Sequence, residues 1–304
     1  MKISLATLNA LYTGFNTKFQ EGLAAGKEDI SIWAMSMPST TKMETYAWLL
    51  LLSTIREWVG PRLVNKLGNQ AAKLVNRDFE HTVGVNRNDI EDDNLGIYAT
   101  LFQAMGADAA ALWPMLGAAA LTETGNWIDG KAFFVADRKF GAETINNLVA
   151  LALSPETFET AYSQMASFKN HAGLPIGKLP THLMVSPDLR STGFEIVKNT
   201  KLIKAVTNKA KSENIGAGVV DNPNAGLTDL IVNPRLAAGS AYLMHCGAVI
   251  KPVAVQKRKE GALVRWDQDT DKNVKDDNEN QYGIHYRGAS TLTLPNLIVK
   301  IKAA

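Results

Sequence analysis

The stretch RDFEHTVGVNRNDIEDDNLGIYATLF, residues 77–102, carries the clearest structural signal in the chain. Apolar and polar residues alternate from Phe79 to Val85, and this period of two is typical of a strand with two unlike faces. An apolar pattern with helical spacing begins near Asn94. Between the two patterns lie four acidic residues, Asp89, Glu91, Asp92 and Asp93. We therefore expect a strand-to-helix joint at Ile90–Leu95, which would be the mechanical centre of the protein.

The composition is that of an ordinary folded protein. The chain has 304 residues, enough for one large domain or two medium ones, with 46% apolar and 20% charged residues. A formal net charge of +2 is too small to indicate nucleic-acid binding over the whole surface. The single cysteine, Cys246, excludes an internal disulfide framework and fits a reducing compartment. On a strand, His245 would point to the opposite face, so a buried structural Cys246 is favoured over a nucleophile pair.

Nothing in the sequence predicts a membrane partner. Polar residues interrupt the apolar residues at the N-terminus, so no secretory signal is visible. The most hydrophobic window, WLLLLSTI at Trp48–Ile55, is shorter than the ~20 residues that a membrane span requires. We expect a protein that is soluble in the cytoplasm when it is synthesised.

The N-terminal part combines a helix with an extended segment. Apolar residues recur at steps of three and four over residues 3–25, which predicts an amphipathic helix. The segment Met35–Thr41, MSMPSTT, predicts an extended linker rather than a packed element. Two interpretations stay open: the helix packs on something other than its own domain, or it covers the chain's own core.

A long projecting hairpin is expected next. Gly60-Pro61 marks a turn, and residues 63–76 contain little apolar surface before the strand that begins at Arg77. A hairpin without a core of its own is marginally stable in isolation. Its stabilisation would then come from a neighbouring copy, and deleting Leu63–Lys73 should leave a folded subunit that forms no stable assembly.

The apolar pattern that begins near Asp93 predicts a helix to about Thr122, with a kink at Pro114. Asp92 or Asp93 would cap its first turn, where negative charge also complements the helix dipole.

The rest of the chain predicts a compact α/β domain followed by more strands. Ser154 is expected to cap a helix from Pro155 to about Asn170, because Pro favours the first helical position. The other expected elements are a short strand within Trp127–Phe134, a helix at Glu143–Leu153, strands at His182–Val185 and Leu230–Val232, a helix from Ser186 to Lys198, strands within Ile250–Trp266 and Gln281–Thr293, and a terminal strand at residues 297–301 that returns to the α/β sheet.

Motifs for catalysis, cofactors and metals are missing from the sequence. The pattern Asp267-x-Asp269-x-Asp271 resembles a calcium loop, but Lys272 and Asn278 stand where that loop needs Gly and Glu. The acidic residues of the joint could bind a divalent cation, although capping and salt bridges between subunits explain them without one. The basic run 257–259 favours a solvated turn over a DNA-binding patch. We therefore expect no catalytic, cofactor or metal residues; the open alternative is an α/β enzyme with scattered site residues.

Four segments resemble the major head subunit of Mu-like phages and prophages. These segments are REWVGPR at 56–62, NRDFEHTVGVNRNDIEDDNLGIY at 76–98, DGKAFF at 129–134 and, more weakly, PSTT…TYAWL within 38–49. The resemblance covers the first half of the chain; from about residue 200 only the order of elements matches.

The resemblance implies an α+β fold of the Hong Kong 97 type (HK97-like). It assigns residues 1–54 to an N-terminal arm, 55–90 to an E-loop hairpin, 91–139 and 251–292 to a P-domain with a long spine helix, and 140–250 and 293–304 to an A-domain. It also implies a major capsid protein that forms hexamers and pentamers of an icosahedral shell around double-stranded DNA. Another phage structural component, a connector or a tail protein, is the alternative.

Partners and contact residues follow from the same resemblance. The partners would be other copies of the chain, a separate scaffold protein, portal and head-completion proteins, and packaged double-stranded DNA contacted non-specifically. The protein would be assembled in the host cytoplasm and reside in the virion. Some shells of this fold cross-link a loop Lys to an Asn, but we expect no such link from Lys66 or Lys73. The candidate inter-subunit contacts are Arg56, Trp58, Arg62, Phe79, Arg87, Asp89, Glu91, Asp92 and Asp93.

Overall fold

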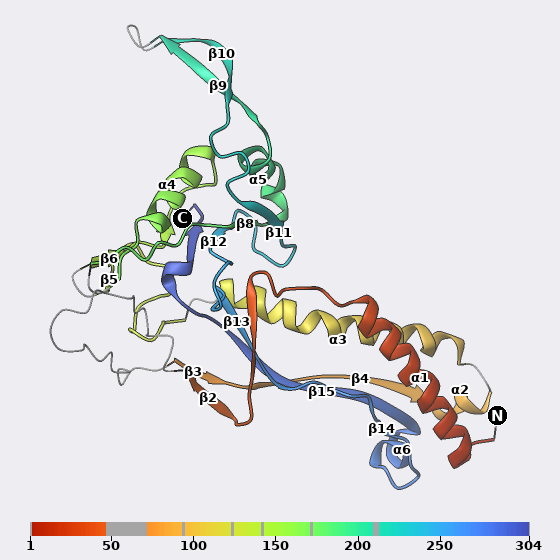
Figure 1. The fold of residues 1–304 in the computed structure, drawn as a ribbon. Helices are drawn as coiled ribbons and strands as arrows, with labels where there is room; N and C mark the ends of the chain where they lie inside the picture. Colours follow the sequence, from red (N-terminus) through yellow and green to blue (C-terminus); the bar gives the residue numbers. More distant parts are fainter. Residues whose placement is uncertain are drawn as a thin grey trace, which may run out of the picture.

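The computed structural model describes residues 2–46, 72–92, 95–122, 125–140, 143–170, 173–208 and 213–303. The described chain forms two lobes, each built on a five-stranded sheet, with the N-terminus at the far end of one lobe and the C-terminus in the other (Figure 1). Two hairpins extend from these lobes.

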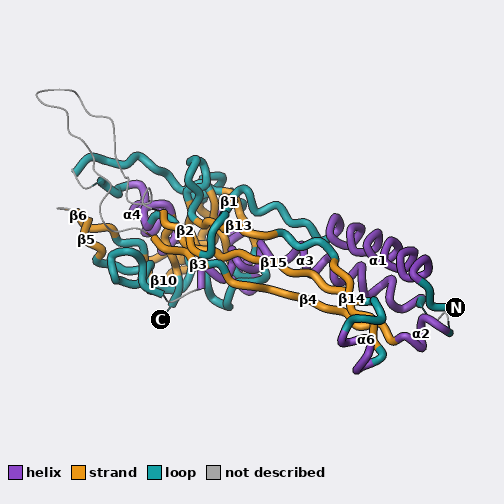
Figure 2. The backbone as a smooth tube through the Cα atoms, turned by 90° about the horizontal axis from the view of Figure 1, so that it is seen from below, coloured by secondary structure: helices purple, strands orange, loops and turns teal. Residues whose placement is uncertain are grey.

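The first lobe is organised by one long strand, β15 (Glu279–Leu292). Strand β4 (Arg77–Asn86) pairs antiparallel along one edge of β15, and β13 (Val253–Lys259) and β14 (Val264–Trp266) pair along the other edge. Strand β1 (Ala34–Pro38) adds to β13 in parallel. Figure 2 shows β4 and β15 running side by side along the length of this lobe.

Two helices cover one face of this sheet. Helix α3 (Gly96–Thr122) packs on β15 and β13, and α1 (Leu5–Ala25) packs on α3 (Figure 1). The core is aromatic at the crossing, where the rings of Phe15 and Phe102 stack at 4.3 Å between centroids and Tyr282 meets Phe102 edge-on at 5.5 Å.

Glycines allow α1 and α3 to approach closely. A Cβ atom at Gly22 would lie 1.9 Å from the Gln103 carbonyl oxygen, and one at Gly106 would lie 2.1 Å from the Phe19 carbonyl oxygen. Because both obstacles are backbone atoms, no side-chain rearrangement could make room. The N-terminal helix therefore covers the core of its own chain, the second of the two interpretations above.

Among the described residues, α3 is the one helix long and apolar enough to cross a membrane by length and composition. Its most apolar window is 61% buried inside the protein, against α1 and the sheet. It is a core helix.

The second lobe contains the sheet β11-β8-β12-β16-β7. Its strands are β7 (Leu148–Val149), β8 (His182–Val185), β11 (Asp229–Val232), β12 (Ala241–Met244) and β16 (Ile298–Ile301). Helices α4 (Pro155–Ala166) and α5 (Arg190–Val197) pack on it, with the 3₁₀ turn η2 (Pro187–Leu189) before α5. As predicted, the terminal strand β16 returns to this sheet.

The remaining elements are small. A hairpin of β9 (Lys201–Asn208) and β10 (Glu213–Asp221) projects from the second lobe (Figure 1). Strands β2 (Met43–Tyr46) and β3 (Ala72–Val75) pair beside the first lobe. The others are α2 (Arg87–Glu91), β5 (Arg138–Phe140), β6 (Glu143–Ile145), α6 (Lys272–Asp277) and the 3₁₀ turn η3 (Pro295–Leu297).

Several predicted elements are confirmed. Strand β4 follows the predicted alternation, and α1 and α3 occupy the predicted stretches. Helix α4 begins as expected, with Pro155 in its first turn and Ser154 sharing a reciprocal capping box with Thr157.

Three predictions were wrong. Residues 34–38 are not a linker but strand β1, because Met37 and its neighbours pair with β13. Residues 143–153 form short strands instead of a helix, since the buried Asn147 accepts a hydrogen bond from the Val135 N–H and donates one to the Phe133 carbonyl. Residues 127–134 form turns and one bridge instead of a strand, held by the Arg138 guanidinium on the Ala132 and Phe133 carbonyls.

Candidate assembly surfaces

The strand-to-helix joint is closed by contacts within the chain. Ile90 is fully buried, and Asn86 caps α2 by accepting a hydrogen bond from the Asn88 N–H at 2.9 Å. Across the joint, the Tyr98 hydroxyl donates to the Asp89 carboxylate at 2.5 Å. Burial, together with this carboxylate, raises the pKa of Tyr98.

Arg87 connects the joint to the tip of the neighbouring hairpin. Its guanidinium lies 2.8 Å from the carboxylate of Asp269, between β14 and α6, and its backbone N–H donates to the Asn278 carbonyl. Arg87 retains 17% of its side-chain exposure, while Asp269 retains 83%. Two of the candidate contact residues, Arg87 and Asp89, are thus engaged inside the subunit.

The other candidates separate into three groups. Glu91 and Asp92 are exposed at the end of α2, where the Asp92 N–H donates to the Asn88 carbonyl and ends the helix. Phe79 is half-buried on β4, with the Arg77 guanidinium 5.8 Å from its ring centroid. Arg56, Trp58, Arg62 and Asp93 lie outside the described residues.

The chemistry that the sequence left open concerns metal-ligating groups and the single cysteine. Over the described ranges, no group of three or more His, Cys, Asp or Glu side chains could hold a metal ion. Cys246 is buried, and burial raises the pKa of its thiol to about 11, so the reactive thiolate is scarce at neutral pH. The neighbouring His245 ring contacts the Leu179 carbonyl instead, at 2.6 Å.

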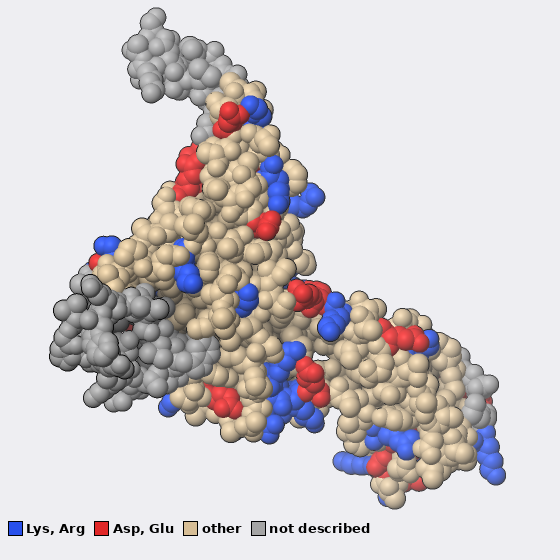
Figure 3. Space-filling view, viewed as in Figure 1, with Lys and Arg blue, Asp and Glu red and all other residues tan. Residues whose placement is uncertain are grey.

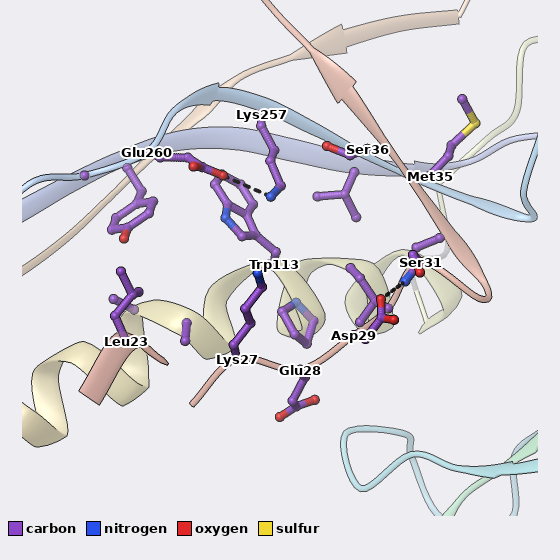
Figure 4. Close-up of a pocket in the computed structure, with 18 residues that line it drawn as sticks. Leu23, Lys27, Glu28, Asp29, Ser31, Met35, Ser36, Trp113, Lys257 and Glu260 are labelled. Carbon is purple, nitrogen blue, oxygen red and sulfur yellow. Dashed lines mark hydrogen bonds and ion pairs between the residues drawn. The ribbon is translucent and has the colours of Figure 1, made fainter. Parts of the chain in front are cut away.

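A cavity of about 920 Å³ lies between the segment after α1, helix α3 and strand β13 (Figure 4). Trp113 and Pro114 form part of its apolar wall, and Lys257 lies over the Trp113 ring at 5.1 Å. Lys257 is also paired with Glu260 at 2.9 Å, as Figure 4 shows. The lining carries charges of both signs, with Lys27, Glu28 and Asp29 on one side and Lys257 and Glu260 on the other, and Figure 4 shows no point on which they converge.

The projecting hairpin β9–β10 presents an apolar pair that the sequence analysis missed. Ile203 and Val219 face each other across the strands, and their side chains are 75% and 70% exposed. In the sequence, KLIKAVTN and ENIGAGVVD stand on either side of a short polar run, and two strand-forming segments around polar residues were a usable hairpin signal.

Charge is dispersed on the face of the molecule shown in Figure 3, where basic and acidic side chains are interspersed. Such a surface lacks the large single-sign field of a dedicated nucleic-acid interface.

Comparison with solved structures defines the class of the fold. The subunit in the procapsid of bacteriophage JBD30 superposes with a TM-score of 0.58 and 25% identity, covering 99% of this chain and 77% of that one. A subunit from the JBD30 capsid decorated with minor capsid protein trimers gives a TM-score of 0.55 and 25% identity over 71% of this chain and 93% of that one. The fold is that of phage capsid proteins of the Hong Kong 97 type, as predicted.

Sequence comparison defines the family. The model described as Mu-like prophage major head subunit gpT matches residues 8–152, 145–224 and 220–304, so the chain belongs to this family. The major capsid protein of Escherichia phage Mu is 42% identical over 110 residues, and the Mu-like prophage FluMu major head subunit of Haemophilus influenzae is 35% identical over 138 residues. These matches span 36% and 44% of the relatives' length, and the same shares of this chain. The family consists of structural head subunits, not enzymes.

Proposed function

We propose that this chain is a major capsid protein whose copies assemble into hexamers and pentamers of an icosahedral shell around double-stranded phage DNA. The observation that carries the proposal is a family match extending from residue 8 to residue 304 on a chain with the capsid fold. Assembly by identical copies also gives the projecting hairpins a use, because burial against a neighbour would stabilise them.

The two lobes support a division into domains. The lobe of α1, α3, β4, β13 and β15 corresponds to the P-domain, with α3 as its spine helix, and the lobe of β8, β12 and β16 corresponds to the A-domain. Residues 1–54 are assigned as the N-terminal arm because they precede the E-loop in the chain. Two elements of this arm, α1 and β1, pack on the P-domain of the same subunit. The E-loop is proposed as residues 55–90, and the pairing of β2 with β3 supports counting Met43–Tyr46 with its first limb.

The contact residues are assigned by exposure. Glu91, the last residue of α2, and Asp92, which follows it, are exposed and are assigned as contacts with a neighbour, whereas Arg87 and Asp89 hold the joint together. Arg56, Trp58, Arg62 and Asp93 stay assigned as contacts on the sequence resemblance alone. Exposed ion pairs contribute little individually, so the apolar burial of the arms would supply most of the stability.

The further partners are a separate scaffold protein, the portal and head-completion proteins, and the packaged DNA. Contact with DNA would be non-specific, through the phosphate backbone. Assembly would occur in the host cytoplasm, and the mature protein would reside in the virion.

Electron microscopy of the purified protein tests the proposal. We expect closed shells, or free hexamers and pentamers, in negative stain. Persistent monomers would overturn the proposal, and rings or tubes with other symmetry would assign the chain to a connector or a tail instead.

A further inference from the structure

A buried polar network joins the β2–β3 hairpin to the sheet of the first lobe. At its centre is Gln256, a fully buried residue of the inner strand β13. Its neighbour Val255 points toward the apolar core under α3, so the side chain of Gln256 lies on the opposite face of the sheet. Figures 1 and 2 show β2 and β3 next to β13 at this end of the sheet.

Both ends of the Gln256 amide are engaged by the hairpin. Its carbonyl oxygen accepts a hydrogen bond from the Tyr46 hydroxyl at 2.6 Å, at the end of β2. Its NH₂ group donates to the Asn76 side-chain carbonyl at 2.7 Å, directly after β3. One side chain of the sheet thus holds both strands of the hairpin.

The network continues into the segment that leads to β2. The NH₂ group of Asn76 donates to the Ser39 hydroxyl and to the Thr41 carbonyl, each at 2.9 Å. The Ser39 hydroxyl donates to the Glu44 carboxylate at 2.9 Å, and the same carboxylate oxygen accepts from the Thr40 and Thr41 N–H groups. Gln256, Asn76 and Ser39 are all buried, so the hydrogen bonds from Gln256 to Asn76 and from Asn76 to Ser39 form away from water. The bonds that the Thr40 and Thr41 N–H groups donate to Glu44 lie at the exposed end of the network.

We propose that Gln256 is the positioning residue of the β2–β3 hairpin: its amide fixes the orientation of these two strands on the sheet of the first lobe. Apolar packing is non-directional, whereas hydrogen bonds require both distance and angle. A hairpin held by hydrogen bonds at each strand cannot rotate about its root without leaving buried amide groups unpaired, which is costly. The consequence for assembly rests on the proposed function, since only a projecting arm aimed correctly can meet a neighbouring copy.

The test compares two glutamines on one face of the same sheet. Gln256→Leu removes the amide at the hairpin root. Gln281→Leu is the control: Gln281 is half-buried on β15 at the other end of that face, and its amide donates to Glu279 rather than to the hairpin. Tyr46→Phe deletes only the hydroxyl that donates to Gln256. If Gln256→Leu does not fold, this smaller change still tests whether the network holds the hairpin. Hydrogen–deuterium exchange on unassembled protein reports on residues 39–46 and 72–76, with the α3 peptides as the internal reference.

We expect at least roughly tenfold faster exchange of these two segments in Gln256→Leu, a smaller increase in Tyr46→Phe, and unchanged exchange in α3. The Tyr46→Phe and Gln256→Leu effects should also be non-additive, because both act on one network. Unchanged protection of residues 39–46 and 72–76 in the folded variants would overturn the proposal, as would an equal effect of Gln281→Leu.

Shell formation is measured separately, per folded subunit. A lower shell yield for Gln256→Leu than for Gln281→Leu, at equal unfolding temperature, supports a role in aiming the hairpin, and equal yields overturn that role. If the unsubstituted protein forms no shells, the proposed function fails, while the exchange measurement still decides the role of Gln256.

Discussion

Glu28 and Arg235 join the two lobes through a two-pronged ion pair, with nitrogen–oxygen distances of 2.8 and 2.7 Å. Glu28 follows α1 in the first lobe, and Arg235 follows β11 in the second. A planar guanidinium matched to both carboxylate oxygens restricts orientation as well as distance. The pair therefore resists rotation of one lobe against the other, beside the cavity of Figure 4.

We predict that Glu28→Gln lowers the free energy of unfolding by up to about 1 kcal/mol at pH 7, because the pair is partly exposed. The hydrogen bond from Arg235 lowers the pKa of Glu28 from 4.5, so its stabilisation is present above pH 4.5 and is lost as the pH falls through the folded-state pKa. Thermal unfolding across pH should show the difference between the two proteins closing in acid. A constant difference down to pH 2 would contradict the assignment.

The close contact between α1 and α3 predicts a large difference between two glycine substitutions. Gly106→Ala should destabilise the protein by about 1–3 kcal/mol or more, because its Cβ would meet the backbone of Phe19. Gly14→Ala, in α1 with no atom within 4 Å of the new Cβ, should be neutral or stabilise by up to about 1 kcal/mol. Chemical denaturation measures both. Similar effects of the two substitutions would mean that the helices do not pack in this way.

At the hairpin root, the N–H groups of Thr40 and Thr41 and the Ser39 hydroxyl lower the pKa of Glu44 from 4.5 to about 2. Because the folded-state pKa is depressed, Glu44 stabilises the fold above pH 4.5, and this contribution disappears as the pH falls toward 2. An NMR titration of the Glu44 side-chain carboxyl carbon should therefore give a midpoint near 2. A midpoint above 4 would show that these hydrogen bonds are absent in solution.

The sequence was most informative where one pattern determined one element. Strand β4 and helix α3 could be predicted because each follows its period over many residues, and α4 because Ser154 and Pro155 mark its start. Strand β1 could not be predicted, because the segment MSMPSTT has no hydrophobic period. Its first residues form a strand only by pairing with β13, more than 200 residues later in the chain.

The roles of the candidate contact residues could likewise not be predicted from the sequence alone. The acidic cluster was visible in the sequence, but its division between a joint and a surface depends on Tyr98 and on Asp269, 182 residues from Arg87. The buried amide of Gln256 could not be anticipated either, because nothing in VAVQKRK distinguishes a buried Gln from an exposed one. The role of Arg87 and the burial of Gln256 both depend on contacts with residues far away in the sequence.

Substitutions at the exposed pair Ile203 and Val219 on β9–β10 should affect assembly without affecting folding. Ile203 and Val219 expose most of their side chains, so Ile203→Lys and Val219→Lys should each change the free energy of unfolding by less than about 0.5 kcal/mol. If the hairpin is buried between copies in the shell, each lysine would place a charge in an apolar contact, and assembly should be strongly reduced. Ile203→Val, which keeps the apolar surface, is the control. Sedimentation of the variants at equal concentration should show shells for Ile203→Val and unassembled subunits for the lysine variants; normal shell yields from both lysine variants would remove this face of β9–β10 from the interface.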